Sequence, residues 1–377
     1  MFELIPGQRP AKELFSRALR DGTLSHAYLL AGPEGLAKTA FARELGIALV
    51  AACGGCGACD ECDRARRGVH PDLHVLEREG DRLRMEQISP IIEELALKPF
   101  AAARRVWVIP EVEYLMAEAA NKLLKSIEEP PDSVYFLLVT DRPERVLPTI
   151  VSRCQVVEFK PVSDEEVLAY LAAEHRLAGA HGEALARLSA GSVERAARLA
   201  ADARGPGRRG LYLKHVAAAL SASDPKTAAE AEHAFLNVLD GLLREIKEEV
   251  AADLAARLAT LERQFQDAKD RKWHSDRAEA RAKREEARRR RLAAVDAVDI
   301  VAAWTRDLWV VACGAPDVLW DCDRGDDLAA AAVATPEYYR RLVEVTEATR
   351  KDLYLNIDFE LAFRAMFSRF EEVADSA

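Results

Sequence analysis

The apolar run Ala27-Tyr-Leu-Leu-Ala31 and the segment that follows it, Gly32-Pro-Glu-Gly-Leu-Ala-Lys-Thr39, decide the fold class of this 377-residue chain. Five apolar residues in a row predict a strand that is covered on both faces, and the residues after Lys38 begin a helical pattern. A loop between a buried strand and a helix is the setting of a phosphate-binding loop, in which backbone N–H groups and the helix N-terminus surround phosphate oxygens. The candidate nucleotide-binding residues of this loop are Gly32, Gly35, Lys38 and Thr39.

Within this loop, Lys38 would reach the terminal phosphates and the Thr39 hydroxyl would ligate Mg²⁺. Ala37 departs from the motif, because a second glycine normally stands there. We expect a Cβ at this position to clash where the loop needs the backbone freedom of glycine or a close approach to a phosphate.

The second half of such a site should be an apolar strand that ends in Asp-Glu, with the Asp for the metal and the Glu for the attacking water. The strand candidate Val106-Trp-Val-Ile109 is followed instead by Pro110 and Glu111. Proline cannot ligate Mg²⁺, and Glu111 would point to the opposite side of an extended chain. We therefore expect a degenerate site without hydrolysis, and the sequence leaves open whether ATP and Mg²⁺ still bind.

Strand and helix patterns alternate through residues 1–160. Such alternation predicts a parallel sheet flanked by helices. The predicted strands are 27–31, 72–76, 106–109, 134–140 and 155–159, and the predicted helices include 11–20, 39–50, 85–95 and 116–128.

Strand patterns nearly vanish after residue 161. Ser163, with Glu166 three residues later, is typical of a helix start, and short helices should form a second domain over residues 161–205. The glycine-rich stretch 204–210 predicts a hinge, and residues 206–377 should form an all-helical domain. In its charged middle, 242–291, the segment 276–291 has eight basic and four acidic residues. That run could be a solvated helix face, a loosely packed hairpin or a nucleic-acid contact.

The overall composition limits the class of protein. Apolar residues make up 49% of the chain, and 53 Lys and Arg against 63 Asp and Glu give a formal net charge of −10. A basic coat for nucleic acid is excluded, although a local basic patch is not. No apolar run reaches the roughly 18 residues of a membrane helix, and the N-terminus has no export pattern. We expect a soluble, cytoplasmic protein without membrane contact.

Four of the seven cysteines follow one another at a spacing of three residues: Cys53, Cys56, Cys59 and Cys62. Four thiolates are the ligand number of a closed structural zinc site, and the glycines between them allow the backbone to wrap around an ion. An iron–sulfur cluster and a metal-free thiol cluster are the alternatives. A closed four-ligand site has no open position, so we assign it no catalytic role.

Taken together, these motifs resemble the clamp-loader branch of the AAA+ ATPases. Ile5-Pro-Gly-Gln8 is similar to the opening box of that family, and the cysteine motif with His70-Pro-Asp72 is similar to the zinc module that bacterial members insert. The run from Val139 to Ser152-Arg-Cys154 is similar to the sensor-1 strand and the Ser-Arg-Cys motif. The resemblance implies an α/β P-loop AAA+ domain with an inserted zinc module, followed by a small helical lid and an all-α C-terminal collar.

The resemblance also implies roles for three further residues. Arg153 would be an arginine finger that acts in trans on the ATP site of a neighbouring subunit. Thr140 would be the sensor-1 residue. Arg195, in Gly191-Ser-Val-Glu-Arg195, would be the sensor-2 residue that faces nucleotide or, in an empty pocket, an ion-pair residue.

A degenerate phosphate loop beside an intact Ser-Arg-Cys motif implies a non-motor, stator-like subunit. Its implied partners are the gamma/tau motor and delta subunits of a hetero-oligomeric ring, the sliding clamp, and primer–template DNA without sequence preference. One alternative is an active gamma/tau-type motor ATPase in which Glu111 or Glu113 takes the metal or water role. Another is a free-standing zinc protein that binds nucleic acid.

Overall fold

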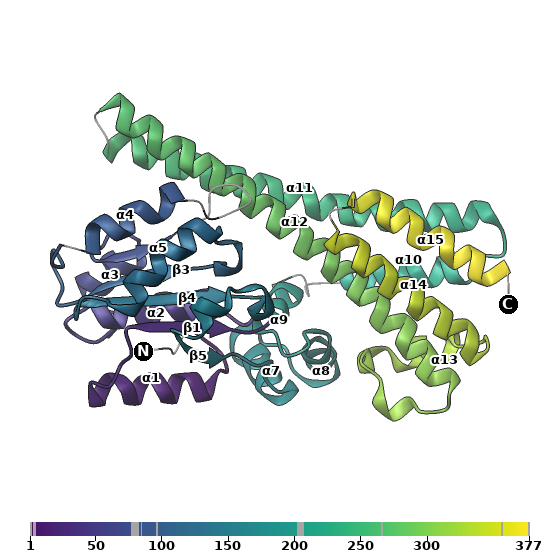
Figure 1. Ribbon diagram of the computed structural model, residues 1–377. Coiled ribbons are helices and arrows are strands. Elements are labelled where there is room, and N and C mark those ends of the chain that lie inside the picture. The colour runs from purple at the N-terminus through teal and green to yellow at the C-terminus, as the bar shows by residue number, and fades with distance from the viewer. Residues whose placement is uncertain are drawn as a thin grey trace. The chain divides into compact units, whose positions relative to one another are not determined.

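The computed structural model describes residues 2, 5–76, 83, 85–95, 97–201, 207–264, 267–355 and 357–375 (Figure 1). The chain divides into two compact units. The first, here called the sheet unit, comprises Met1–Glu166 and Ser192–Glu194, and the second, the helical unit, comprises Val167–Gly191 and Arg195–Ala377. The division into an ATPase-type domain, a lid and a collar stays a prediction.

A five-stranded sheet forms the centre of the sheet unit, with the strand order β2-β3-β4-β1-β5 and every pair parallel. Each predicted strand is present, so the predicted parallel α/β architecture is confirmed. The strands are β1 (Ala27–Ala31), β2 (Leu73–Val75), β3 (Arg105–Ile109), β4 (Val134–Thr140) and β5 (Gln155–Glu158).

Helices cover both faces of the sheet, because alternate residues of each buried strand enter different cores. Leu30 packs with the helices α1, α2 and α3, whereas Leu29 packs with α4, α5 and α6. All five residues of β1 are buried, as the run of apolar residues predicted. The helices are α1 (Arg9–Asp21), α2 (Lys38–Val50), α3 (Asp60–Arg66), α4 (Met85–Leu95), α5 (Ala117–Glu128) and α6 (Pro148–Val151).

The carboxyl ends of β1, β3 and β4 lie at one edge of the sheet, because the three strands are parallel neighbours. The segments that leave this edge begin at Gly32, Pro110 and Asp141. The phosphate loop, the degenerate strand end and the residues after Thr140 therefore meet there.

Helices make up the rest of the described chain. The segments α7 (Asp164–Tyr170) and α9 (Val193–Ala201) each cross the boundary between the units. The Ser163 hydroxyl accepts a hydrogen bond from the N–H of Glu166 at 3.3 Å, as the predicted helix start requires. The remaining helices are α8 (Gly179–Leu188), α10 (Gly207–Leu220), α11 (Pro225–Gln264), α12 (Ala268–Ala312), α13 (Gly325–Ala331), α14 (Pro336–Tyr354) and α15 (Phe359–Asp375).

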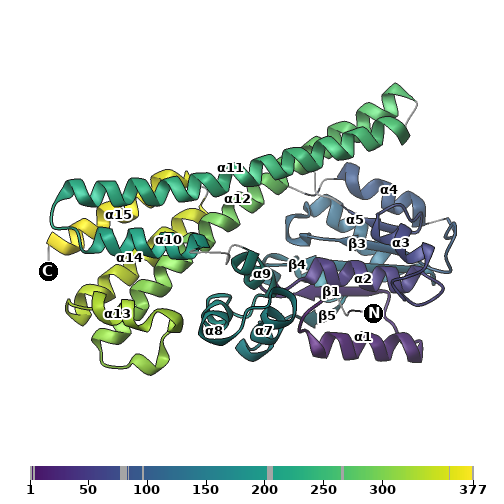
Figure 2. The same ribbon diagram turned by 180° about the vertical axis from the view of Figure 1, so that it is seen from behind.

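Two long helices, α11 and α12, contain the charged segment 242–291 and lie side by side in both views (Figures 1 and 2). Leu243 and Ile246 of α11 share a core with Val295 and Val298 of α12. The segment thus forms a helical hairpin, and a nucleic-acid contact by its basic part stays a prediction. The predicted hinge is only partly described: residues 202–206 lie outside the described chain, and Gly207 already begins α10. In the part of the chain that the structure describes, no helix is long and apolar enough to span a membrane.

Candidate nucleotide site and metal centre

The phosphate loop has a backbone that requires glycine at two predicted positions. Gly32 has a φ of +153°, and a Cβ built on it would lie 2.3 Å from the carbonyl oxygen of Phe159. Gly35 has a φ of +85°, and a Cβ there would lie 2.4 Å from the hydroxyl oxygen of Ser192. That hydroxyl donates a hydrogen bond to the Gly35 carbonyl at 2.8 Å, which ties the loop to the residue that precedes α9.

Ala37 is the residue at which the loop is strained. It precedes α2 with φ 56° and ψ 24°, in the left-handed region, which costs an alanine about 1–2 kcal/mol. The loop forms nonetheless, and the Ala37 side chain packs against the apolar core beneath α1 and α2. Backbone strain is thus one consequence of the missing glycine, and a clash with an approaching phosphate stays a prediction.

We expect Ala37→Gly to stabilise the sheet unit by about 0.5–1 kcal/mol, because glycine adopts the left-handed conformation without strain. Calorimetric unfolding of the full chain measures the change. Ala40→Gly, three residues later on the exposed side of α2, is the matched control and should destabilise by about 1 kcal/mol. Equal destabilisation by both changes would contradict the strain at Ala37.

Lys38 is the most buried charged residue of the loop, with 3% of its surface exposed. Its ammonium lies 2.7 Å from Oδ1 of Asp141, the residue directly after β4, and it also donates to the carbonyl of Pro33. Thr39 is partly buried in the first turn of α2. An incoming phosphate would have to compete with Asp141 for the lysine.

The degenerate strand end differs from the extended chain that the sequence led us to expect. After Pro110, Glu111 takes a left-handed conformation with a φ of 54°, and a short 3₁₀ turn follows at Val112–Tyr114. The prediction that Glu111 points to the opposite side of an extended strand is therefore wrong, because the chain turns at that residue. The turn brings the next carboxylate, Glu113, to the site.

Glu113 lies with Thr140 and Asp141 at the carboxyl edge of the sheet. Burial raises the pKa of Glu113, a hydrogen bond from the Thr140 hydroxyl opposes the rise, and the charge of Asp141 adds to it. Thr140 is fully buried, and its hydroxyl oxygen also accepts the N–H of Arg142 at 3.0 Å. The structure therefore joins Lys38, Asp141, Thr140 and Glu113 in one cluster. Asp141 was not predicted, although a carboxylate directly after a buried strand is a signal that could have found it.

Arg153 lies apart from this cluster, between α6 and β5, with 36% of its side chain exposed. Its Nε pairs with the carboxylate of Glu128, the last residue of α5, and its Nη1 donates to the Thr149 carbonyl at 3.1 Å. The guanidinium is thus held at the surface of its own unit.

Arg195 is paired inside the helical unit. Its guanidinium lies 3.1 Å from Asp296 and 2.9 Å from Asp299, both on α12, and 13% of the side chain is exposed. Burial raises the pKa of Asp299, and the charges of Arg195 and Arg350 oppose that rise. The structure thus shows an ion-pair residue, and the sensor-2 role stays a prediction.

The four cysteines of the predicted metal motif converge, with all Sγ atoms within 4.8 Å of one another. Cys53 Sγ lies 3.4 Å from Cys59 Sγ and 3.5 Å from Cys62 Sγ. Bond lengths of about 2.3 Å in a tetrahedral zinc site place sulfur atoms about 3.8 Å apart. The thiols therefore fit one ion, whereas an iron–sulfur cluster would place several atoms between them.

The environments of these thiols differ. Backbone and side-chain hydrogen bonds from Cys56 lower the pKa of Cys53 to about 6, whereas burial raises the pKa of Cys62. Metal binding requires all four thiols to be deprotonated, so an ion would stabilise the buried thiolate of Cys62 most.

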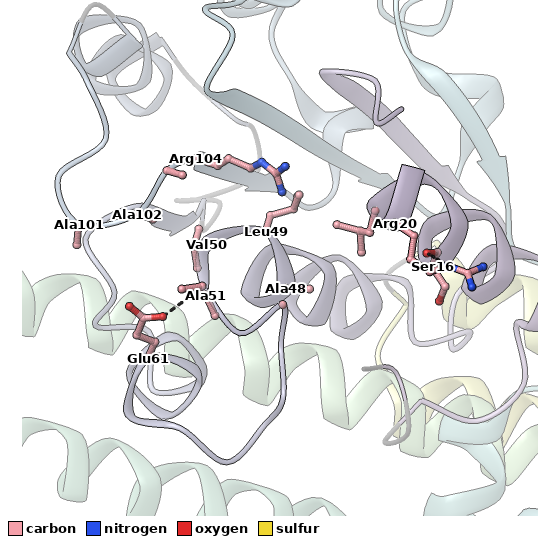
Figure 3. A pocket seen from close by; sticks show the side chains of 14 residues that line it. Ser16, Arg20, Ala48, Leu49, Val50, Ala51, Glu61, Ala101, Ala102 and Arg104 are labelled. Atoms are coloured by element: carbon pink, nitrogen blue, oxygen red, sulfur yellow. Dashed lines mark hydrogen bonds between the residues drawn. The ribbon is translucent and has the colours of Figure 1, made fainter. Parts of the chain in front are cut away.

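A separate cavity of about 780 Å³ lies at the C-terminal end of α2, the end opposite to the phosphate loop (Figure 3). It is bordered by α1, by the start of the cysteine segment and by residues 101–104. Asp72 fixes that last segment, because its carboxylate accepts the N–H groups of Ala101 and Ala102 at 2.7 and 2.8 Å. None of the predicted nucleotide-binding residues lines this cavity.

The first part of the chain is similar to known proteins. The model of the family described as "DNA polymerase III, delta subunit" matches residues 7–163. A delta-prime subunit of DNA polymerase III from Bacillus subtilis is 35% identical over 176 residues, which cover 44% of this chain and 51% of that protein. Residues 7–163 of this chain are therefore similar to DNA polymerase III subunits.

The similarity extends to more than one kind of DNA polymerase III subunit. A DNA polymerase III gamma subunit from Buchnera aphidicola is 33% identical and covers 45% of this chain and 48% of its own length. The chain thus spans about half the length of these curated relatives. A solved gamma-subunit-related protein from Thermotoga maritima aligns over 95% of this chain and 99% of its own, with 17% identity and a TM-score of 0.38.

Proposed function

We propose that this protein is a non-motor, delta-prime-type subunit of a DNA polymerase III clamp loader. In this role it joins gamma/tau motor subunits and a delta subunit in a ring in the cytoplasm, and it helps to load the sliding clamp on primed DNA. The observation that carries the proposal is a difference in burial between two paired cations of the sheet unit. Lys38 pairs with Asp141 and is buried, whereas Arg153 pairs with Glu128 at the surface.

The phosphate loop supports the absence of hydrolysis by this chain. Lys38 is neutralised by a carboxylate of its own chain, Ala37 strains the loop, and Pro110 occupies the position of a metal-binding Asp. ATP and Mg²⁺ would meet a site that lacks the free lysine charge and the carboxylate that hydrolysis requires.

Arg153 supports a role in a neighbour's reaction. A guanidinium is permanently charged and presents planar donors that suit the charge developing on a transferred γ-phosphoryl group. With about a third of its surface exposed, Arg153 can contact another molecule without unfolding its own segment.

The second candidate function is a gamma/tau-type motor ATPase, which the position of Glu113 favours. This carboxylate lies beside Thr140 at the edge of the sheet where the water-activating glutamate of a motor would act. The similar identities to delta-prime and gamma relatives fit either subunit.

Turnover of ATP by the purified chain with Mg²⁺, beside Lys38→Ala, distinguishes the two functions. We expect no turnover by either protein, because the lysine is paired and the metal carboxylate is missing. Nucleotide binding is measured in parallel by calorimetry. Turnover that Lys38→Ala abolishes would overturn the non-motor proposal in favour of the motor ATPase.

We also propose that Cys53, Cys56, Cys59 and Cys62 hold a structural Zn²⁺. The closed set of four thiols and the sulfur separations support a single ion that pins the chain between α2 and α3. Contact with primer–template DNA, if the ring forms as proposed, would be local and independent of sequence.

A further inference from the structure

The Arg153 side chain is held by groups of its own unit on one side only. Glu128 ends α5, and its carboxylate pairs with Nε of Arg153 across 25 residues of sequence. The Thr149 carbonyl and the Ser152 hydroxyl accept from Nη1 at 3.1 and 3.4 Å. Three acceptors thus surround one end of the guanidinium.

Nη2, at the other end of the guanidinium, could donate hydrogen bonds to a second molecule. Arginine has five N–H donors, two of them on Nη2. Among the residues that the structure describes, none accepts a hydrogen bond from Nη2 of Arg153. The side chain is therefore anchored through Nε and Nη1, and the two N–H groups of Nη2 have no acceptor among the described residues.

The Glu128–Arg153 ion pair contributes little to the stability of the folded chain. Side-chain exposures of 36% for Arg153 and 43% for Glu128 place the pair in solvent, where such pairs add little to folding. What the pair does change is the freedom of a long side chain, because an arginine without a partner samples many rotamers.

We propose that Glu128 is the positioning residue of Arg153, an inference that rests on the proposed function. Glu128 holds the guanidinium in one orientation before the neighbouring subunit binds ATP, so that Nη2 meets the γ-phosphate without a search among rotamers. Orientation of this kind acts on the rate of the chemical step rather than on nucleotide affinity.

The test uses the clamp loader assembled from this chain and its partner subunits. We expect Glu128→Ala to lower kcat for ATP hydrolysis about tenfold and to leave KM for ATP within about twofold. Glu128→Gln should restore part of the rate, because the amide oxygen still accepts from Nε. Melting of each variant chain should match the parent, as the exposure of the pair requires.

Glu129→Gln is the matched control, because this neighbouring exposed carboxylate lies beyond α5 and has no ion pair among the described residues. It should leave kcat unchanged.

A double variant distinguishes positioning of Arg153 from a purely structural role of Glu128. In an Arg153→Ala background there is no guanidinium to position, so Glu128→Ala should have no further effect on kcat.

Failure of the inference and failure of the proposed function give different results. If Arg153→Ala lowers kcat and Glu128→Ala does not, only the positioning role is overturned. If Arg153→Ala has no effect on the complex, the finger role fails and the positioning role fails with it. An equal loss from Glu128→Ala with and without Arg153 would also overturn positioning.

Discussion

Arg153→Ala is expected to lower the ATPase rate of the assembled clamp loader by a factor on the order of 10³ at the site that Arg153 serves. The physical reason is the loss of a permanent positive charge beside the γ-phosphoryl group, where negative charge is redistributed in the transition state. If other sites in the ring act independently, the loss in the total rate is smaller. Steady-state hydrolysis by the assembled complex measures it.

Two variants sharpen the Arg153 prediction. Arg153→Lys keeps the charge but loses the planar fork, so it should recover only part of the rate. Arg145→Ala removes an exposed arginine of the same segment that has no ion pair among the described residues, and it should leave the rate unchanged. Assembly of the ring should be normal in all three variants. A complex with Arg153→Ala that hydrolyses ATP at the parental rate would refute the finger assignment.

Removal of the metal, by chelation or by Cys56→Ser, is expected to destabilise the sheet unit by several kcal/mol. Structural zinc contributes about 10–16 kcal/mol to the folding of isolated zinc-finger peptides. The effect should be smaller here, because the sheet and its two cores fold around their own apolar residues. Calorimetric melting, with elemental analysis for one zinc per chain, measures the effect.

Cys313→Ser is the control for the metal prediction, because Cys313 is an exposed thiol of the helical unit, far along the chain from the cluster. It should change neither the zinc content nor the melting of the sheet unit. A melting curve that stays the same after Cys56→Ser would contradict a structural metal.

The strands of the sheet unit could be predicted closely because their signal is local. The segments 27–31 and 134–140 are continuous apolar runs, and both are buried along their whole length. The strand end after Ile109 could not be predicted, because a left-handed residue at Glu111 has no signal in side-chain periodicity. That single turn decides that Glu113, and not Glu111, joins Thr140.

In the candidate site, too, some features could be predicted from the sequence and others could not. The chemical types were predictable from short-range spacing: a lysine and a threonine after a glycine-rich loop, four thiols at intervals of three, and an arginine in a Ser-Arg-Cys motif. Their partners were not predictable. Lys38 pairs with Asp141 and Arg195 pairs with Asp296, each about a hundred residues away along the chain.

The sequence by itself determined the parallel α/β architecture, the phosphate loop with its missing glycine and the cluster of four cysteines, since each depends on patterns within short segments. Only the tertiary structure decided which charges are neutralised. Lys38 is buried against Asp141, and Arg153 pairs with Glu128 at the surface. The reason is physical: a salt bridge depends on distance in space, and the order of strands in a parallel sheet brings together residues that no sequence spacing relates.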